Sequence, residues 1–504
     1  MIHISLNIRS LAARGFMLLI FLLGWGAAQH LQAQNTVNIL EAENIDRGTY
    51  QGEPVQKILG NVHMQNKNLE VFCDSAYKFL GKSEIRAYGN VQVNTESEKI
   101  WSDTLTYFTD VDFSQLRGRV IIEADSTTLY GNSVDYRFST KVAHFLDQIR
   151  LEDQRGTLLA NSGFYYREAD SAEFRGQVQL ADSLQYLEGD SLFSNRRTDY
   201  YELYGDIYGN DRENDSMIQG NYLESDSTGR RLLTGRQNNA WLKSFETDTT
   251  DSTRADTTHI RAREILSLEE RTATDTTALV MGYDSVRIWS PNFASVSDTS
   301  KYNNKTETFE LWSKAKAWYE QVQLSGPYIE AQLRNGDIDS LKSYPRPFAV
   351  QQDTVIDRLN QMIGDTLHAD FKDGSLHQIY VFGNAHLIKF LKDQSSPNGL
   401  VDITAPKFRI FFENGELTSF KGTGSNNGTR LPETEKTANR QLDGFTWNPK
   451  LKPQRPQQKM QRRFPPITND VFFDLPQRYI QHLRDEHPKS KKLEKSSNAA
   501  KERP

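Results

Sequence analysis

The stretch LRGRVIIEADSTTLYGNSVDYRF, residues 116–138, decides the fold because its skeleton occurs elsewhere in the chain. Residues 87–108, AYGNVQVNTESEKIWSDTLTYF, show the same order of features: a glycine, an alternating aliphatic run, a polar stretch, a short polar pair and aromatic residues. The matching glycines, Gly89 and Gly118, define a 29-residue spacing. A skeleton that recurs at a fixed distance indicates a repeat protein.

An anchor residue marks the start of each repeat. The same 29-residue spacing holds in all five gaps between successive anchors, which are Gly60, Gly89, Gly118, Asp147, Gly176 and Gly205. Equal gaps of this kind are typical of repeat folds, in which one unit buries its apolar face only against its neighbours.

Aliphatic residues follow the anchors at alternate positions, which is the pattern of a half-buried strand. Those two and four residues after the anchors are Val62, Met64, Val91, Val93, Val120, Ile122, Ile149, Leu151, Val178, Leu180 and Ile207. A second apolar position, eleven residues after the anchor, holds Val71, Ile100, Leu129, Leu158 and Leu187. We expect these side chains to line one continuous interior.

A short polar pair lies fourteen and fifteen residues after the anchors, as Asp74-Ser75, Asp103-Thr104, Asn132-Ser133, Asn161-Ser162 and Asp190-Ser191. A ladder of metal ligands or catalytic carboxylates would need acidic groups throughout, and asparagine is neither an acid nor a base. Asx and Ser side chains instead satisfy backbone groups where a strand bends, and the glycine suits a turn or a bulge. Each repeat is predicted to be two or three short strands joined by tight bends.

The second half of the chain shows a looser pattern. A Thr/Asp-rich segment at 245–259 is predicted to be a loop or linker between a repeat region at 34–244 and a more divergent β region at 260–430. Within the latter, Asn335-Gly336, Asp373-Gly374 and Asn414-Gly415 interrupt alternating runs. Such dipeptides predict type I′ hairpins, because both central residues need positive φ.

The two termini differ from the body. Residues 1–33 predict a secretory signal peptide, with Arg9 and Arg14 before an apolar run at 15–28 and Ala33 at a cleavage position. The alternative is an uncleaved membrane anchor. Residues 431–504 are rich in Pro, Gln, Lys and Arg, so a basic, mostly disordered tail is expected.

Charge and cysteine content restrict the class of protein. Residues 448–504 hold 14 Lys and Arg against 6 Asp and Glu, a net charge of +8, which leaves −14 for the rest of a chain whose total is −6. The acidic body argues against nucleic acid as a partner. Cys73 is the only cysteine, so no intramolecular disulfide forms, and its apolar surroundings predict a small buried side chain.

Motifs that carry chemistry are absent from the sequence. It contains no HExxH, nucleophile elbow, phosphate-binding loop or dinucleotide fingerprint, and its ten histidines are scattered. We therefore predict neither catalytic residues nor a metal site nor a cofactor, and we do not expect an enzyme.

The repeat resembles the OstA/LptA family of lipopolysaccharide-transport proteins. The similarity lies in ILGNVHMQNKNLEVFCDSAYKF (58–79) and its successors and, more weakly, in DFKDGSLHQIYVFGNA (370–385). It implies an elongated β-jellyroll of stacked antiparallel strands with an apolar interior, located in the periplasm and in some cases associated with the outer membrane. It further implies a bridge that carries lipopolysaccharide, with other envelope transport proteins or a second copy joined by edge-strand pairing.

Two other functions remain open from the sequence. One is a structural envelope solenoid that binds partners or glycans without transporting lipid. The other is an enzyme on a parallel β-helix, although the coils of such a helix are shorter than this repeat and carry a carboxylate cluster. An open apolar groove favours transport, whereas a sealed core favours a scaffold.

Overall fold

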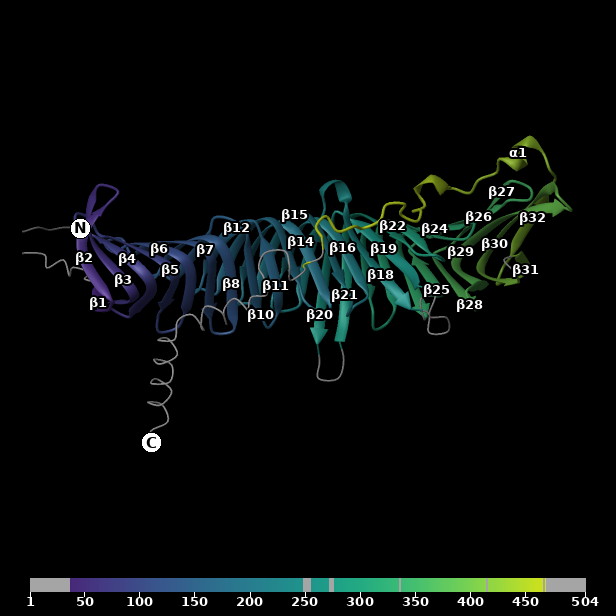
Figure 1. The fold of residues 1–504 in the computed structure, drawn as a ribbon. Helices are drawn as coiled ribbons and strands as arrows, with labels where there is room; N and C mark the ends of the chain where they lie inside the picture. Colours follow the sequence, from purple (N-terminus) through teal and green to yellow (C-terminus); the bar gives the residue numbers. More distant parts are fainter. Residues whose placement is uncertain are drawn as a thin grey trace, which may run out of the picture.

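A computed structural model describes residues 37–247, 255–271, 276–334, 337–413, 416–465 and 467. In these residues, 32 strands form one antiparallel sheet that curls around an elongated apolar interior (Figure 1). The predicted all-β fold is therefore confirmed. The predicted signal peptide, residues 1–33, lies outside the described residues. No helix in the described ranges is long and apolar enough to cross a membrane.

The strands follow one another along the long axis in nearly sequential order. Those of the N-terminal array are β1 Asn38–Glu41, β2 Asn44–Tyr50, β3 Glu53–Asn66, β4 Leu69–Phe79, β5 Glu84–Asn94, β6 Lys99–Phe108, β7 Phe113–Ala124, β8 Thr127–Arg137, β9 Val142–Phe145, β10 Ile149–Asp153, β11 Gly156–Ala160, β12 Ser162–Tyr166, β13 Ser171–Ala181, β14 Gln185–Asn195, β15 Tyr200–Asp211 and β16 Ser216–Ser225.

The C-terminal half continues the same sheet without a break between two regions, since β16 pairs with β18. Its strands are β17 Arg230–Thr234, β18 Ala240–Thr247, β19 Ala255–Ala262, β20 Glu264–Arg271, β21 Thr276–Trp289, β22 Ala294–Asn303, β23 Thr308–Tyr319, β24 Val322–Arg334, β25 Asp337–Tyr344, β26 Phe348–Asp353, β27 Arg358–Ile363, β28 Thr366–Lys372, β29 Ser375–Asp393, β30 Ser396–Glu413, β31 Glu416–Thr423 and β32 Asn427–Leu431. Short helical turns are η1 Arg236–Asn238, α1 Glu435–Ala438 and η2 Pro449–Leu451.

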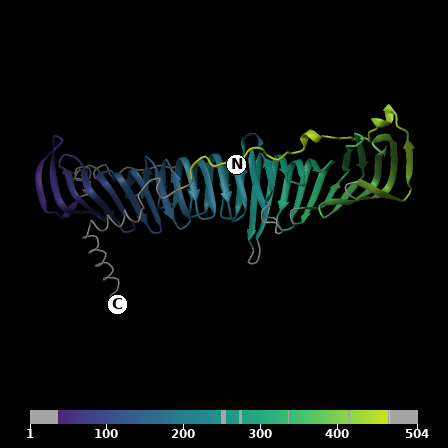
Figure 2. The ribbon, with the colours of Figure 1, turned by 45° about the vertical axis from the view of Figure 1, so that its right-hand side comes forward.

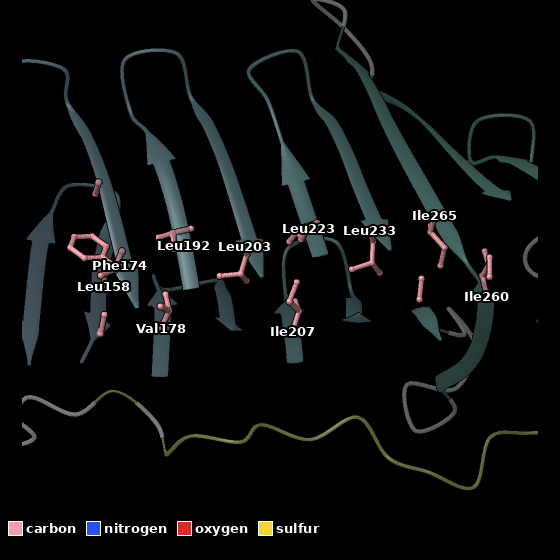
Figure 3. Close-up of a cluster of buried hydrophobic side chains, with 14 of the residues drawn as sticks. Leu158, Phe174, Val178, Leu192, Leu203, Ile207, Leu223, Leu233, Ile260 and Ile265 are labelled. Carbon is pink, nitrogen blue, oxygen red and sulfur yellow. The ribbon is translucent and has the colours of Figure 1, made fainter. Parts of the chain in front are cut away.

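Each regular repeat consists of two long bent strands, rather than the two or three short strands expected from the sequence. In β7, Gly118 and Arg119 both have positive φ, 73° and 44°, and the register with β8 slips between Arg117 and Val120. The register also slips at the other four glycine anchors, and at all of them except Gly205 the residue after the glycine has positive φ as well. A bulge bends a strand, so the two halves of a strand lie in opposite walls of the interior. In Figure 3, Leu203 and Ile207 lie on either side of the bulge of β15.

The polar pair of each repeat packs against the bulge of the following repeat. A Cβ atom added to Gly118 would lie 2.3 Å from Oδ2 of Asp103, and one added to Gly89 would lie 2.2 Å from Oδ2 of Asp74. Glycine is thus required both by its φ and by the close approach of a side chain. In the fourth repeat the anchor is Asp147, whose Oδ1 accepts hydrogen bonds from the backbone N–H groups of Asn132 and Ser133 at 3.3 and 3.2 Å. The strands β9 to β12 are short at this point.

The C-terminal half keeps the same bend, with glycine in β29 and without it in β21 and β23. In β29, Gly383 and Asn384 have φ values of 70° and 45°, and the register slips between Phe382 and Ala385. Asp284 and Ser285 in β21, and Ser313 and Lys314 in β23, all have φ between 53° and 63°. Asp284 and Ser313 are one repeat length apart in the sequence, and the register slips at both sites. The bends at Asp284 and Ser313 therefore continue the 29-residue repeat into the C-terminal half, although the glycines of that half do not show this spacing. At the predicted turn Asp373-Gly374 both φ values are positive, as a type I′ turn requires, whereas residues 335–336 and 414–415 lie outside the described residues.

The predicted linker at 245–259 is corrected by the structure. Residues 245–247 end β18 and residues 255–259 begin β19, and the two strands pair antiparallel from Ala240↔Ala262 to Thr247↔Ala255. Threonine has a high strand propensity, and pairing satisfies the backbone of a segment whose composition resembles that of a loop. Residues 248–254 lie outside the described residues.

The expected disorder of residues 431–504 is corrected for residues 432–465, which we call the C-terminal strap. The strap leaves β32 and runs back along the body toward β14 (Figures 1 and 2). Leu442 and Met460 are buried against the sheet. Composition alone predicted disorder because the partners of the strap are distant in sequence: Gln323 bonds to Asn448, and Glu188 to Arg463. The rest of the tail prediction concerns residues 468–504, which lie outside the described residues.

Candidate functional site: the apolar interior and its seam

The interior brings together all eleven sequence-predicted residues. Ten of them are 0–5% exposed, and the remaining one, Leu180, is half-buried and packs against the same cluster. This hydrophobic cluster is continuous from Val37 to Phe412. Burial raises the pKa of the Cys73 thiol in this cluster to about 12, consistent with a small apolar side chain rather than a reactive thiol. Figure 3 shows one part of the cluster, with side chains from both walls meeting.

Sequence reasoning missed a second set of interior residues, two positions before each anchor. These residues are 0–1% exposed, and they are Ile58, Ala87, Leu116, Phe145, Phe174 and Leu203. They lie on the other side of the bulge from the predicted set and therefore supply the opposite wall. Their own 29-residue spacing was a signal that could have identified them.

Two rows of turns face each other along one side of the N-terminal array, and we call the line between them the seam. One row contains the turns near residues 66–69, 95–98, 124–127, 153–156 and 182–185. The other contains the turns near 109–112, 138–141, 167–170 and 196–199. Side chains cross from one row to the other, as in the 3.4 Å hydrogen bond that Asn66 Nδ2 donates to the Tyr107 hydroxyl.

Buried ion pairs close the seam in successive repeats. The Glu98 carboxylate is 2% exposed, accepts a 2.5 Å hydrogen bond from the Tyr136 hydroxyl and lies 3.2 Å from Nη1 of Arg167. One repeat later, Arg196 is paired with Asp153. Arg167 and Arg196 are one repeat length apart in the sequence, so the repeat places a guanidinium at the same point of the seam twice. Burial and the nearby Glu98 charge raise the pKa of Tyr136, which keeps this hydroxyl protonated as a donor.

A cavity of about 310 Å³ opens at the seam beside this second ion pair. Its apolar wall is formed by Leu151, Leu158, Phe174, Leu180, Leu187 and Leu192. Its rim carries Asp153, Arg155, Arg196 and Asp199. Only Leu151 and Leu180 of the eleven predicted residues reach this cavity. The volume falls at the lower end of the range of about 300–1,000 Å³ that is usual for ligand pockets.

Two other cavities in the interior are much smaller. A cavity beside Met362 measures about 40 Å³ and one beside Met64 about 10 Å³. A further hollow of about 420 Å³ lies over the turns at the start of the seam, between Asn66 and Lys141, and is lined mainly by polar residues. At the seam cavity the apolar interior of the N-terminal array reaches the surface.

The two ends of the sheet expose apolar side chains on edge strands. Leu40 on β1 is 51% exposed and Ile45 on β2 is 48% exposed, while at the opposite end Phe420 on β31 is 46% exposed. In the described sheet β1 and β2 pair only with β3, and β31 and β32 only with β30. Edge strands of this kind can accept a further strand.

The charged side chains that line the seam cavity are aspartates and arginines. Within the described ranges, no group of three or more His, Cys, Asp or Glu side chains is placed to hold a metal ion. The carboxylates at the seam are engaged in ion pairs with arginines. The arrangement can hold an apolar ligand in the interior and an anionic group near the guanidinium groups at the rim.

Comparison with known families agrees with this geometry. Residues 34–190 match the sequence model of a family described as OstA-like protein. The matched segment extends from the N-terminal edge of the sheet into β14 and includes Leu151, Phe174 and Leu180 of the seam cavity. No curated protein matches the chain. The resemblance expected from the repeat is therefore confirmed for the N-terminal array.

Proposed function

We propose that this chain, OstA-like in its N-terminal array, holds lipid acyl chains in its interior and passes lipopolysaccharide along the cell envelope. One observation carries the proposal: a single apolar cluster runs through the sheet and reaches the surface at the seam cavity. Covering an acyl chain is worth about 0.8 kcal/mol per CH₂ group. Because hydrophobic contact is non-directional, a chain can move along such an interior without breaking specific bonds.

The seam supplies the entry point in this proposal. Phe174 and Leu180 would contact the acyl chains, and Arg155 at the rim would contact an anionic headgroup. The Arg155 side chain is 58% exposed and lies 3.5 Å from Asp199, so solvent screens this ion pair and leaves its guanidinium accessible. Arginine suits this position because its planar fork binds phosphate oxygens in pairs.

In this proposal, the edge strands at the two ends of the sheet pair with strands of other proteins. Leu40 and Ile45 at one edge, and Phe420 at the other, would be covered by a further strand from another envelope transport protein or a second copy. Head-to-tail pairing would join two interiors end to end. A periplasmic location, with outer-membrane association as a further element of the proposal, agrees with the signal peptide expected at residues 1–33.

A closed envelope scaffold is the second candidate, and one observation favours it. Ten of the eleven interior residues predicted from the sequence are no more than 5% exposed, so most of the interior is already filled by the protein's own side chains. Transport then requires the two walls to separate along the seam when lipid enters. The two candidates differ in what happens at Leu180, which borders the cavity, and at Val120, which does not.

The test places a photoreactive benzoylphenylalanine at Leu180 in cells, with Val120 as the matched interior control. We expect a lipopolysaccharide adduct at Leu180. We also expect Leu180→Asp to fold, with a melting temperature within a few degrees of the wild type, and to lose lipid captured by a crosslinker at Leu158. Val120→Asp should lower stability by several kcal/mol, because its carboxylate would be buried without a partner. A folded protein that captures no lipid at Leu180 would leave the scaffold as the better interpretation.

A further inference from the structure

The outer face of the sheet carries a continuous line of paired residues, which we call the outer row. Its N-terminal part runs through Gln92, Trp101, Ile121, Tyr130, Arg150 and Leu159, each paired with the next across neighbouring strands. Their neighbours in the chain, such as Ile100 and Ile122, belong to the interior cluster. Side chains alternate between the two faces of a strand, so the outer row points away from the interior.

Beyond Leu159 the outer row continues through Gln179, Glu188, Tyr208, Gln219 and Trp241. The C-terminal strap covers this part. Met460 packs with Tyr208 and Trp241, and the guanidinium of Arg462 lies 3.4 Å from the ring centre of Tyr186, two residues before Glu188.

Buried amides and carboxylates on this face hold the backbone of the strap. Gln361 is 2% exposed; its Oε1 accepts from the N–H of Leu442 at 2.8 Å, and its Nε2 donates to the carbonyl of Arg440 at 2.9 Å. The Gln361 amide therefore both accepts from a backbone N–H and donates to a backbone carbonyl, as the backbone of a neighbouring strand would.

The same device recurs twice along the strap. Gln323 accepts from the N–H of Asn448 at 2.8 Å and donates to the carbonyl of Thr446 at 3.0 Å. Glu188, which is fully buried, accepts from the backbone N–H groups of Arg463 and Phe464 at 2.6 and 3.3 Å. The strap is thus positioned by polar side chains between apolar contacts.

The N-terminal part of the outer row repeats this composition. Trp101, Ile121, Tyr130 and Leu159 are 0–3% exposed although they point outward, so this stretch of the outer face is a covered surface. Gln92 is 2% exposed, and its Nε2 donates to Asn94 at 2.7 Å. Its buried Oε1 has no hydrogen-bond partner in the described part of the chain. A buried carbonyl oxygen of this kind is suited to accept a backbone N–H, as Gln361 does.

The path of the strap leads toward this surface. From Gln323 on β24 to Glu188 on β14 the strap crosses eight strand-to-strand steps, about 38 Å at about 4.8 Å each, between residues 448 and 463. This is about 2.5 Å per residue. From Glu188 to Gln92 on β5 there are seven steps, about 34 Å, which about 13 further residues cover at the same rate. The chain would reach Gln92 near residue 477, well within the segment 468–504.

We propose that the C-terminal segment 468–504 docks on the outer row between Gln179 and Gln92 and so extends the strap over the N-terminal array. Its sequence DVFFDLPQRYI, residues 470–480, falls at the required distance and carries the apolar side chains that the surface needs. By this spacing, Phe472 and Phe473 lie over Tyr130 and Ile121, and Leu475 lies over Trp101. Gln92 then binds the backbone that follows. The occupant is the chain's own terminus, which goes beyond the lipid function proposed for the opposite face.

The test uses the full-length chain with benzoylphenylalanine at Ile121. The matched control is Gln115 on the same strand, which points outward on the other wall, between the buried Ser114 and Leu116. We expect an intramolecular crosslink from Ile121 to a peptide within residues 468–486, and none from Gln115. Mixing isotope-labelled and unlabelled chains separates this product from a contact between copies. A crosslink from Ile121 to residues 1–36, to another copy or to a different protein would overturn the proposal.

A second readout needs no crosslinker. The double variant Phe472→Asp/Phe473→Asp should lower crosslinking from Ile121 at least tenfold and speed tryptic cleavage after Arg478 at least tenfold. The controls are the double variant Lys491→Ser/Lys492→Ser, which should change neither rate by more than about twofold, and an unchanged melting temperature of the body. Equal cleavage rates in the wild type and the Phe472/Phe473 variant would also overturn the proposal.

Discussion

The N-terminal array and the C-terminal half bend their strands in the same way, but β21 and β23 of the C-terminal half do so with different residues. In β7 the bend is made by Gly118 and Arg119, beneath the carboxylate of Asp103. In β21 it is made by Asp284 and Ser285, at nearly the same φ values and with the same slip in register. The geometry is therefore common to both strands, and the glycine is not.

The difference separates two demands that a bend makes on its first residue. Positive φ alone is tolerated by Asp, Asn and Ser, whose short polar side chains bond locally. A neighbouring side chain at the Cβ position is tolerated only by glycine, because any Cβ atom would collide with it. Bends that are covered by Asp or Asn keep their glycine, as Gly118 does beneath Asp103 and Gly383 does beneath Asp365 in the C-terminal half. Because β21 and β23 bend without glycine, the repeat is harder to recognise from glycine spacing in that half.

The largest effect is expected from breaking the first type of bend. Gly118→Val would place a β-branched residue at φ 73° with its Cβ 2.3 Å from Asp103. We expect a loss of about 3 kcal/mol in the free energy of unfolding of the N-terminal array. Urea denaturation followed by hydrogen exchange in β5 to β8 measures it. Gly81→Val is the control, since nothing lies within 4 Å of its Cβ position; equal losses for the two variants would refute the argument.

A smaller, pH-dependent effect should appear only where the strap covers the sheet. Burial, together with the charges of Lys243, Arg261 and Arg455, lowers the pKa of His259 to about 4, against about 6.5 in an unfolded chain. Neutral His259 also accepts a hydrogen bond from the Trp241 indole at 3.1 Å. The pKa of His259 is lower in the folded chain than in the unfolded chain. The contribution of neutral His259 to the free energy of unfolding is therefore complete above pH 6.5 and is lost as the pH falls toward 4. We expect a loss of roughly 1–3 kcal/mol over that window.

The measurement compares hydrogen exchange of peptides from β18 to β21 with that of peptides from β5 to β8 at pH 7.5 and 4.5, after correction for intrinsic rates. His259→Gln keeps an acceptor for the indole N–H but does not titrate, so this variant should remove the additional pH dependence of β18 to β21. If both regions lose the same stability in the wild type and in the variant, His259 is not responsible.

The smallest effect is expected from converting the second type of bend into the first. Ser313→Gly relieves a left-handed serine with φ 61° but adds backbone freedom to the unfolded chain. These two changes oppose each other, so the free energy of unfolding should move by no more than about 0.5 kcal/mol in either direction. Thermal denaturation is sufficient to measure it. If the free energy of unfolding fell by more than about 1 kcal/mol, the Ser313 side chain would have to make a stabilising contact in addition to its effect on the backbone conformation.

The interior was predictable in part because strand alternation is local. Val62, Val91 and Val120 follow their anchors at a fixed distance, and each is 0–1% exposed. The opposite wall was missed, although Leu116 and Phe174 precede their anchors at an equally fixed distance. The predicted residues all follow their anchors, so they all belong to one wall. The residues of the opposite wall precede the anchors, because the bulge at the anchor separates the two walls.

Segments whose partners are distant in sequence could not be assigned from composition. Residues 255–259 resemble a loop until β18 pairs with them, and the strap resembles a disordered tail until Gln323, Gln361 and Glu188 bind its backbone. Those side chains lie from about 80 to more than 270 residues away along the chain. The sequence of the strap contains no pattern that indicates these partners.

The amino-acid sequence by itself determined the strand content, the 29-residue repeat and the apolar interior. These features follow from two periods in the sequence: apolar residues at every second position within a strand, and anchors every 29 residues. The tertiary structure alone decided where that interior opens, how Arg167 and Arg196 close the seam, and which face receives the strap. The physical reason is the range of the interactions. Alternation and turn preferences act over a few residues, whereas the seam and the strap join groups that meet only after neighbouring repeats have stacked.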